Sequence, residues 1–466
     1  MREHEREYPR DDAFESLLAQ SVAELPPEEI VADVTPWRRA MERVLFGLAL
    51  CMVTLNFWCL NYLLPAIGTV LLLLGFRALR RENPWLGGCF VCAVLRTACV
   101  FPSLILNTTI LPGDACRSAA AAVSAALMLA LLLCCALVLP LSACGEAKST
   151  TQQIFDMDTV MDLTAYGKKA DDGINAAISI INSMDTLLDP ENERSKTYEI
   201  NHAMGSPVVV NEQIAKMLRT ALTVYERTNG AFDLTTYPLS KLWGFIDQNY
   251  RVPSDAEIER LLPCVDMSKV QLAATDDSAN SLVTMPADMA LSFGAVAKGC
   301  ASEYAIQAMR AAGVTSGVVS LGGNVQTLGK KPDGSDWNIA IQDPNDTGSY
   351  LGYLTVGETA VITSGSYQRY FTEGGQKYHH ILSPTTGRPV NNGLLAVTIV
   401  CEDGTLADCL STAMFVLGPQ AALNYWRTYG GFEMLLVKTD GHVVLTNGLY
   451  GQFTPNGDSY VVDYAS

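Results

Sequence analysis

The sequence predicts an α+β globular domain preceded by a helical transmembrane region. Apolar residues crowd into the first third of the 466-residue chain, and the overall hydrophobic content of 49% is high for a soluble protein. From Ile154 onward, short β-rich runs mix with helical patterns in no regular order, which favours α+β over a βαβ winding. The net charge of −17 argues against sequence-independent binding to a nucleic-acid backbone.

Composition divides the chain into four segments. Residues 1–36 are charged and contain proline, so we expect a polar tail without a stable fold. Residues 37–143 carry the predicted transmembrane helices and end in a motif that resembles a lipobox. Residues 144–153 form a polar linker, and residues 154–466 form the globular domain.

The first apolar run, Leu45–Phe76, is longer than one membrane span needs. Asn61 and Pro65 lie near its middle, so two short spans or a hairpin fit better than one helix. Arginines before and after the run place both of its ends in the cytoplasm. Leu86–Leu111 is a weaker span because Arg96 lies in its middle.

Ala119–Leu141 is the strongest predicted span. It leads into Cys144 through a segment that resembles a bacterial lipobox, and the alternative is a plain transmembrane anchor. If the segment around Arg96 does not span, everything after Cys144 lies outside the cell; if it does, the same domain lies inside. The lipobox-like ending favours a bacterial cell-membrane protein whose globular domain is extracytoplasmic.

The later cysteines argue against a zinc site or a dense disulfide framework in the globular domain. Nine of the thirteen cysteines lie at or before Cys144, and no Cys-x-x-Cys or Cys/His cluster follows.

Periodicity predicts the main elements of the globular domain. The predicted helices are Ile174–Met184, Gln213–Thr228, Ala295–Ala312 and Leu406–Leu417. The predicted strands are Val208–Val210, Gly317–Leu321, Trp337–Ile341, Ala360–Thr363, Leu395–Val400 and Glu433–Val437.

Asp408 and Thr412 are four residues apart on a predicted helix and therefore share one helical face. Their oxygens could bind one hard cation such as Mg²⁺. Two structural alternatives stay open. Thr405 with Asp408 also fits a capping box, and Thr412 could bond back to the carbonyl four residues earlier.

Lys298 lies in the predicted first turn of a helix that follows Gly294. Free N–H groups at such a helix start attract phosphate, and a lysine there would add a point charge; the alternative is a solvated lysine. Gly322 and Gly323 close the next strand, where they allow either a tight turn or the close approach of a ligand to the backbone. Neither common nucleotide-binding glycine motif occurs.

Two further segments carry candidate residues. Phe232 and Asp233 lie in an aromatic, turn-rich stretch that either packs in the core or presents Asp233 to a base or ribose edge. His379 and His380 are neighbours in an extended run, so they point to opposite faces and only one can face a given pocket. A histidine there suits proton transfer, while the alternative is a structural role.

Together and in this order, these motifs resemble the ApbE family of FAD:protein FMN transferases. The resemblance covers about Phe155 to Leu417. It is carried by Met157-Asp158-Thr159, Gly230 to Asp233 with Leu242-Trp243-Gly244-Phe245, Ala297-Lys298-Gly299, Leu321-Gly322-Gly323-Asn324, Thr363-Ser364-Gly365 with Tyr367-Gln368-Arg369-Tyr370-Phe371, His380-Ile381-Leu382 with Pro384-Thr385-Thr386-Gly387, and Ala407-Asp408 with Thr412.

The resemblance implies a T-fold-like α+β domain that binds FAD and Mg²⁺. It implies transfer of FMN to a threonine or serine hydroxyl of a partner protein, with release of AMP. His380 matches the catalytic histidine, and His379 would be its outward neighbour. By position, the residues implied to border FAD are Met157, Ala231, Phe232, Asp233, Lys298, Tyr304 and Ile381, to which the turn glycines Gly322 and Gly323 are added. The implied metal ligands are Asp408, Thr412 and the main-chain oxygen of Ala301.

The sequence departs from the family pattern at three places. Ser292 and Ser383 stand where the family has aspartate, and its tyrosine or serine near Leu187 to Pro190 is not evident. The expected acceptor is a subunit of a redox complex or a secreted flavoprotein. The alternatives are an Mg²⁺-dependent FAD pyrophosphatase and a non-catalytic, membrane-anchored FAD-binding protein.

Overall fold

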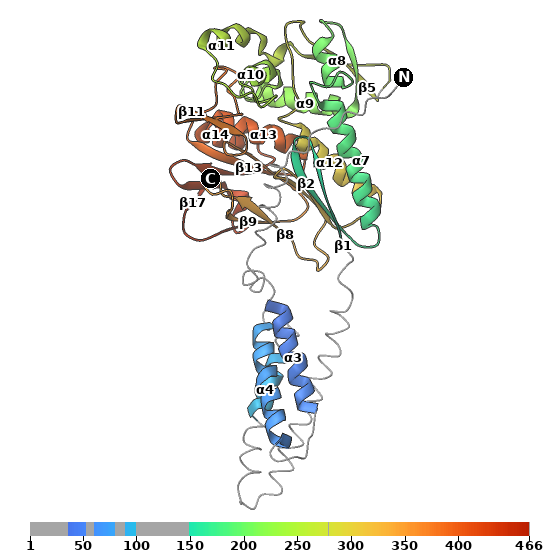
Figure 1. Ribbon diagram of the computed structural model, residues 1–466, viewed down its shortest axis with the longest axis vertical. Coiled ribbons are helices and arrows are strands. Elements are labelled where there is room, and N and C mark those ends of the chain that lie inside the picture. The colour runs from blue at the N-terminus through green and yellow to red at the C-terminus, as the bar shows by residue number, and fades with distance from the viewer. Residues whose placement is uncertain (1–35, 53–59, 80–88, 99–148, 278, 466) are drawn as a thin grey trace, which may run out of the picture. The chain divides into compact units, whose positions relative to one another are not determined.

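The chain forms two compact units, residues 1–145 and residues 146–466. The computed structural model describes residues 36–52, 60–79, 89–98, 149–277 and 279–465. Figure 1 shows the helices of the first unit in blue and the elements of the second from green to red.

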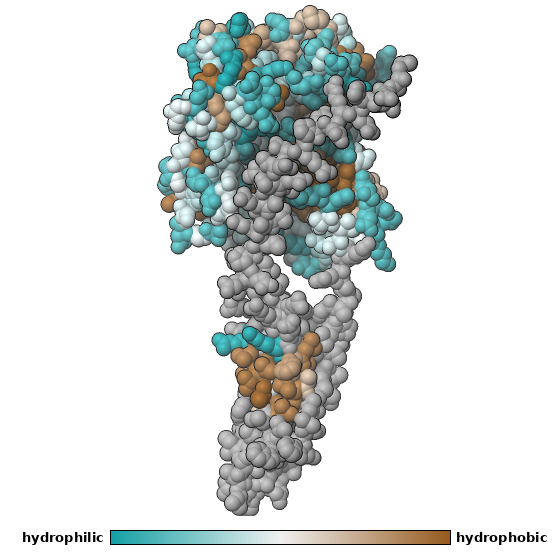
Figure 2. All heavy atoms as spheres, in the orientation of Figure 1, coloured by the Kyte–Doolittle hydropathy of each residue, from teal (hydrophilic) through white to brown (hydrophobic). Residues whose placement is uncertain are grey.

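Two helices, α3 (Pro36–Met52) and α4 (Leu60–Leu79), pack against each other in the first unit. They meet at glycines, because a Cβ on Gly68 would lie 2.6 Å from the carbonyl oxygen of Gly47. The described parts of the run Leu45–Phe76, for which two short spans or a hairpin were predicted, belong to these two helices. Apolar side chains remain exposed on this unit and appear as brown atoms in Figure 2; they include Leu45, Phe46, Val91 and Leu95.

The described residues cover the predicted membrane region only in part. Among the helices in the described ranges, none combines the length and the apolarity that crossing a bilayer requires. The strongest predicted span, Ala119–Leu141, and the lipobox-like Cys144 lie outside the described residues.

A nine-stranded sheet organises the second unit, in the order β1-β2-β6-β7-β10-β13-β14-β15-β17. Neighbouring strands are antiparallel except β15 and β17, which run parallel. Its strands are β1 (Ser149–Asp156), β2 (Thr159–Tyr166), β6 (Gly317–Leu321), β7 (Asn324–Leu328), β10 (Ala360–Gly365), β13 (Leu394–Cys401), β14 (Glu433–Lys438), β15 (His442–Thr446) and β17 (Val461–Ala465).

Three smaller sheets surround it. Two of them are three-stranded, with the orders β3-β5-β4 and β16-β9-β8, and the third is the hairpin β11-β12. Their strands are β3 (Val208–Asn211), β4 (Gln271–Ala274), β5 (Asn280–Thr284), β8 (Trp337–Gln342), β9 (Tyr350–Val356), β11 (Tyr370–Glu373), β12 (Gln376–His379) and β16 (Phe453–Pro455).

Helices α7, α12 and α13 pack against the nine-stranded sheet, and α9 packs against α13 (Figure 1). The helices of this unit are α7 (Ala170–Leu188), α8 (Lys196–His202), α9 (Glu212–Arg227), α10 (Tyr237–Leu242), α11 (Asp255–Leu261), α12 (Ala297–Ala311), α13 (Gly404–Leu417) and α14 (Pro419–Tyr429). Short 3₁₀ turns occur at Leu234–Thr236, Leu262–Cys264, Met267–Lys269 and Asn447–Leu449.

Strand β14 is buried on both faces of the nine-stranded sheet. Met434 and Leu436 belong to the core shared with the helices, whereas Leu435 and Val437 belong to a second core shared with β8, β9 and β16. Because successive side chains of a strand point to opposite faces, a strand between two cores is an uninterrupted apolar run. That run is what made β14 predictable.

The predicted helices and strands all occur, with ends that differ by a few residues. One boundary differs in kind. Strand β1 begins at Ser149, inside the segment 144–153 that was predicted to be a linker. The residues of β1 that fall in this segment, 149–153, are serine, threonine and glutamine at the sheet edge, so they lack the apolar alternation that marks a strand.

Candidate active site

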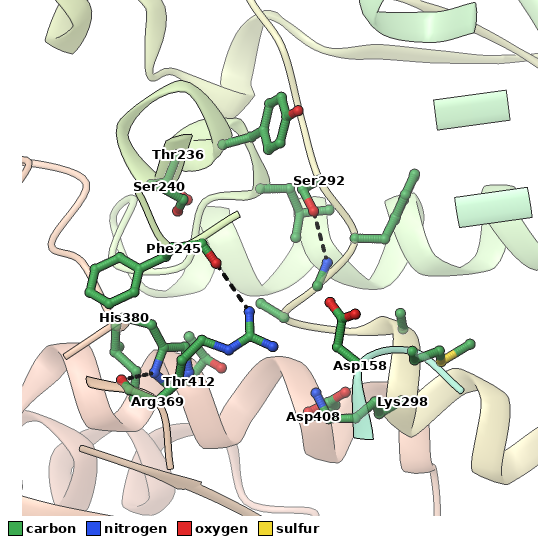
Figure 3. Close-up of a pocket in the computed structure, with 18 of the residues that line it drawn as sticks. Asp158, Thr236, Ser240, Phe245, Ser292, Lys298, Arg369, His380, Asp408 and Thr412 are labelled. Atoms are coloured by element: carbon green, nitrogen blue, oxygen red, sulfur yellow. Dashed lines mark hydrogen bonds between the residues drawn. The ribbon is translucent and has the colours of Figure 1, made fainter. Parts of the chain in front are cut away.

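A pocket of about 840 Å³ opens at the ends of several elements of the second unit. This volume lies within the range of roughly 300–1,000 Å³ that is typical of cofactor and ligand sites. Its walls come from the β1–β2 turn, the start of α12, the end of β10, the segment leading into the β11–β12 hairpin, and α13 (Figure 3).

Most of the residues singled out by sequence lie in this pocket. Those that line it are Met157, Ala231, Phe232, Asp233, Lys298, His380, Ile381, Asp408 and Thr412. Those that do not line it are Ala301, Tyr304, Gly322 and Gly323.

Asp408 is held where α12 and α13 meet. Its side chain is 4% exposed, and its Oδ2 accepts a hydrogen bond from the Gly299 amide at 2.8 Å. Its Oδ1 accepts one from Nδ2 of Asn324 at 3.1 Å. Gly299 permits this contact because a Cβ there would lie 2.2 Å from the carbonyl oxygen of Gly404. The positive end of the α12 dipole further favours the carboxylate.

The structure decides between the alternatives for Asp408 and Thr412. Asp403 caps α13, because its Oδ1 accepts from the Leu406 amide at 2.8 Å, so Asp408 does not belong to a capping box. Oγ1 of Thr412 lies 3.3 Å from Oγ of Ser364, on β10. Asp408 and Thr412 therefore face the pocket, and neither side chain caps α13.

Ala301 does not fit the role of metal ligand that the resemblance implied. It is fully buried inside α12, where its carbonyl is part of the helical hydrogen-bond ladder. Ala295 precedes the helix and lines the pocket. Among the described residues no hydrogen bond to the Ala295 carbonyl is found, so this oxygen is available to a ligand.

The remaining donors suit a hard cation. Asp408 supplies a carboxylate, Thr412 a hydroxyl and Ala295 a carbonyl, and Mg²⁺ prefers such oxygen ligands together with water and substrate phosphate. Within the described residues there is no group of three or more His, Cys, Asp or Glu side chains that could hold a metal. A cation here would thus depend on its substrate for several ligands.

The glycine pair makes a tight turn between β6 and β7. Gly322 and Gly323 have φ values of +59° and +93°, and a Cβ on Gly322 would lie 2.4 Å from Oγ1 of Thr159. This corresponds to the turn alternative rather than to a ligand approach. The next residue, Asn324, reaches Asp408 and lines the pocket.

Tyr304 lies on α12 and packs against the helix-side core. Asp233 is buried at the pocket wall, but its carboxylate is engaged inside the protein. Its Oδ1 accepts from the Thr235 amide at 2.7 Å, and its Oδ2 accepts from the Met267 amide at 3.0 Å. Burial raises the pKa of Asp233. Its carboxylate therefore shapes the loop that forms the wall.

The two histidines face opposite sides at the end of β12, and it is His379 that packs into the core. His379 was predicted to be the outward neighbour, but it is 7% exposed, contacts the Phe415 ring edge-on, and its Nε2 lies 2.8 Å from the Val390 carbonyl oxygen. His380 lines the pocket. The strand alternation was predicted correctly, but the direction of His379 was wrong because the core lies behind β12.

His380 has one ring nitrogen fixed and one free to act. Its Nδ1 lies 3.1 Å from the carbonyl oxygen of Arg369 and must donate to it, because a carbonyl only accepts. Nε2 then carries the lone pair of the neutral imidazole. Burial and the charges of Arg369 and Lys298 lower the pKa of His380 to about 3. The imidazole is therefore neutral at pH 7, with Nε2 unprotonated and open as a hydrogen-bond acceptor.

Aromatic side chains support the histidine. The ring of Phe245 approaches that of His380 edge-on, with centroids 6.4 Å apart. Trp243 is fully buried, and its Nε1 donates to the carbonyl oxygen of Gly387 at 2.8 Å. This bond joins the Leu-Trp-Gly-Phe and Pro-Thr-Thr-Gly motifs, which are 144 residues apart in sequence.

The ApbE family model matches residues 157–436 of the chain, which include all of these site residues. The chain belongs to the ApbE family. Its predicted α+β fold is confirmed by solved ApbE structures. The ApbE protein of Thermotoga maritima is 30% identical, with a TM-score of 0.61 over 66% of this chain and 99% of that one. The apo flavinyl transferase ApbE of Pseudomonas stutzeri is 26% identical, with a TM-score of 0.58 over 67% of this chain and 98% of that one.

Curated relatives in the ApbE family carry the name FAD:protein FMN transferase. The one from Klebsiella pneumoniae is 30% identical over 285 residues, which cover 61% of this chain and 87% of the relative. The one from Treponema pallidum is 30% identical over 307 residues, which cover 62% of this chain and 85% of the relative.

Ser292 and Ser383, two positions where the sequence departs from the expected pattern, keep local turns in place. Oγ of Ser292, which lines the pocket, accepts from the Gly294 amide at 3.2 Å. Oγ of Ser383 accepts from the Thr386 amide at 3.3 Å. Serine and aspartate side chains both make such bonds to a backbone amide two or three residues on, so the turns do not require a carboxylate.

Sequence reasoning included Arg369, Asn324 and Asp158 in the motifs of the resemblance but gave none of them a role in the site, although all three line the pocket. A signal for Arg369 existed. Gly374 and Gly375 form the turn of the β11–β12 hairpin, which pairs Tyr370 with His379 and so brings Arg369 opposite His380.

The pocket is strongly acidic. Among the described residues that line it, two are full cations, Lys298 and Arg369, and seven are carboxylates. The carboxylates are Asp156, Asp158, Asp185, Asp189, Glu191, Asp233 and Asp408. Asp185 lies on α7 beside the β1–β2 turn, and burial and the neighbouring Asp156 raise its pKa to about 6. An anionic ligand must therefore be placed near Lys298 and Arg369 or enter with a cation.

Proposed function

We propose that this chain is an Mg²⁺-dependent FAD:protein FMN transferase. It attaches FMN from FAD through a phosphoester bond to a threonine or serine of a partner protein and releases AMP. The observation that carries the proposal is one cofactor-sized pocket that combines the neutral imidazole of His380 with the oxygens of Asp408 and Thr412. The names of the curated relatives support the same activity.

The residues divide the chemistry between them. Nε2 of His380 takes the proton from the acceptor hydroxyl, whose oxygen attacks the flavin-side phosphorus of FAD. A new P–O bond forms, the bond to the bridging oxygen breaks, and that oxygen leaves with AMP. Mg²⁺ held by Asp408, Thr412 and the Ala295 carbonyl would neutralise charge on the diphosphate. Lys298, at the start of α12, adds positive charge on the same side.

Purified chain, FAD, Mg²⁺ and a candidate acceptor test the proposal. Candidate acceptors are subunits of redox complexes and secreted flavoproteins. We expect a fluorescent covalent flavin band on the acceptor after denaturing electrophoresis, and none when Asp408→Ala replaces the wild type, because Mg²⁺ binding is lost with that carboxylate. Release of free FMN and AMP without acceptor, faster than transfer, would show a pyrophosphatase instead. FAD binding with neither reaction would leave a flavin carrier.

The proposal extends to the membrane. The apolar run Ala119–Leu141, the lipobox-like sequence at Cys144 and the exposed apolar side chains of the first unit support an anchored protein with an extracytoplasmic catalytic domain. Mass spectrometry of the mature N-terminus and protease digestion of intact cells test it. A domain resistant to protease until the cells are lysed would place it inside.

A further inference from the structure

We propose that Arg369 binds the flavin-side phosphate of FAD, the group that this enzyme transfers, and so acts beside His380 at the reacting phosphorus. The inference rests on the proposed function and adds to it a residue that contacts the substrate. It comes from the position of Arg369 in the fold and from the charge of the pocket.

The backbone of Arg369 is fixed to the proposed base. Its carbonyl oxygen accepts from the His380 amide at 3.1 Å and from Nδ1 of the His380 ring at 3.1 Å. Arg369 and His380 therefore cannot move apart without breaking the contact that sets the tautomer of the imidazole. The Arg369 side chain therefore starts beside the imidazole and enters the same pocket that His380 lines.

The guanidinium has hydrogen-bonding capacity left for a ligand. Its Nη1 lies 3.4 Å from the Phe245 carbonyl oxygen, a long contact, and among the described residues no carboxylate pairs with it. Arginine carries five N–H donors in a planar fork that matches two phosphate oxygens. In Figure 3 the side chain of Arg369 extends from the His380 side of the pocket toward Lys298 and Asp408.

The charge balance indicates which phosphate each cation serves. Seven carboxylates line the pocket, so a doubly anionic diphosphate needs both Lys298 and Arg369. Lys298 lies on α12 next to the Gly299 amide that binds Asp408. Arg369 lies beside His380, which acts on the hydroxyl that attacks the flavin-side phosphorus. The guanidinium consequently belongs to the flavin phosphate rather than to the AMP phosphate.

Binding of small ligands to the full-length chain tests the assignment without any acceptor. The variants are Arg369→Gln, Arg369→Lys and, as a control, Lys377→Gln, which removes a cation of the same hairpin that lies over the Tyr370 ring outside the pocket lining. We expect Arg369→Gln to weaken FMN binding by about 10- to 100-fold, the usual effect of losing a charged hydrogen bond. Affinity for riboflavin and for AMP should stay unchanged, and Arg369→Lys should recover part of the loss.

Kinetics provide the second readout. In the transfer assay Arg369→Gln should lower kcat more than it raises KM for FAD, because charge on the transferred phosphate shifts during the reaction. Unchanged FMN affinity in Arg369→Gln would overturn the inference, and so would an equal loss of AMP affinity, which would place the guanidinium on the other phosphate. If the wild-type chain binds FMN through Arg369 but transfers nothing, the proposed function is wrong and the phosphate-binding role of Arg369 still holds.

Discussion

At the scale of single residues, His379 and His380 show how one position in a strand separates structure from chemistry. His379 packs under β12 against Phe415, and His380 faces the pocket with Nδ1 held by the Arg369 carbonyl. Two adjacent residues of the same type should therefore respond to substitution in different ways.

We predict that His380→Ala lowers kcat of transfer by at least about 100-fold, the usual contribution of a positioned general base. FAD binding and thermal stability should be retained, since the side chain lies in the pocket wall. His379→Ala is the matched comparison. It should lower the free energy of unfolding by about 1–3 kcal/mol, because the Val390 carbonyl loses its partner and a cavity opens beside Phe415. Urea denaturation and transfer assays on both variants measure the two effects. A similar loss of stability in both variants would contradict the assignment of a structural role to His379 and a catalytic role to His380.

A second prediction concerns pH. Burial and the charges of Arg369 and Lys298 lower the pKa of His380 from 6.5 to about 3. As the pH falls below 6.5 the unfolded chain takes up a proton at this residue, whereas the folded chain does so only near pH 3. His380 therefore contributes stability above pH 6.5 that is lost as the pH falls through this window.

Urea denaturation across that pH range should give a shallower pH dependence for His380→Ala than for the wild type. In the wild-type enzyme, the pH profile of kcat/KM should show no protonation step at the ordinary histidine value. A step near pH 6.5 that disappears in His380→Ala would show that the imidazole is not shielded.

Several pocket residues could be found from sequence because each belongs to a motif with its own chemistry, as Asp408 and Thr412 do. Their roles stay predictions. Ala301 was assigned by its position in the family resemblance, and the assignment fails because Ala301 lies inside α12, where its carbonyl is not free. Arg369 was given no role because its importance arises only when the hairpin brings it opposite His380.

At the scale of elements, the crossing of α12 and α13 fixes the proposed metal site. Gly299 and Gly404 allow the two helix starts to touch, and the Gly299 amide then binds Asp408. A side chain at either glycine must force the helices apart. Lys216, which bonds Glu303 at 2.5 Å, ties α9 to the same helix pair.

We predict that Gly299→Ala destabilises the fold by about 1–3 kcal/mol, as overpacking in a core does, and also impairs Mg²⁺-dependent transfer. The new Cβ would lie 2.2 Å from the Gly404 carbonyl oxygen and 2.5 Å from Cβ of Asp408. Gly357→Ala is the control, because its Cβ would meet only Oδ1 of Asp336, at 3.9 Å. Thermal unfolding and transfer assays on both variants measure the two effects. Wild-type stability and activity of Gly299→Ala would rule out the close contact of α12 and α13 at Gly299.

Elements with a clear period were predictable, and those without one were not. Strands such as β13 and β14 are buried on both faces and stand out as apolar runs. Strand β1 is polar and lies at the edge, and the β11–β12 hairpin pairs only with itself. Such strands are stabilised by packing and pairing with neighbouring elements, and a single sequence does not reveal which elements are neighbours.

At the scale of the whole molecule, the pocket and its supporting cores belong to one unit. Every pocket-lining residue lies between Phe155 and Val416, within residues 146–466. The cores on both faces of the nine-stranded sheet are built from the same unit. A separate apolar cluster in the first unit consists of Val44, Leu48, Leu72, Phe76, Cys89 and Ala93.

We therefore predict that residues 146–466, produced alone, fold cooperatively and bind FAD with the affinity of the full-length chain. Circular dichroism during heating and flavin fluorescence titration measure these properties. Transfer to a soluble acceptor should also be retained. Loss of FAD binding together with a broad unfolding transition would show that the first unit is needed for the fold of the second.

The bonds that Gly299 and Asn324 donate to Asp408 have one more consequence. They aim the carboxylate before any ion arrives, so little reorganisation opposes the entry of a divalent cation. In a pocket this acidic, a bound divalent cation would relieve the repulsion that the anionic dinucleotide meets, and the phosphates of the dinucleotide would add oxygen ligands to the cation. By thermodynamic reciprocity, Mg²⁺ should tighten FAD binding by the same factor by which FAD tightens the binding of Mg²⁺.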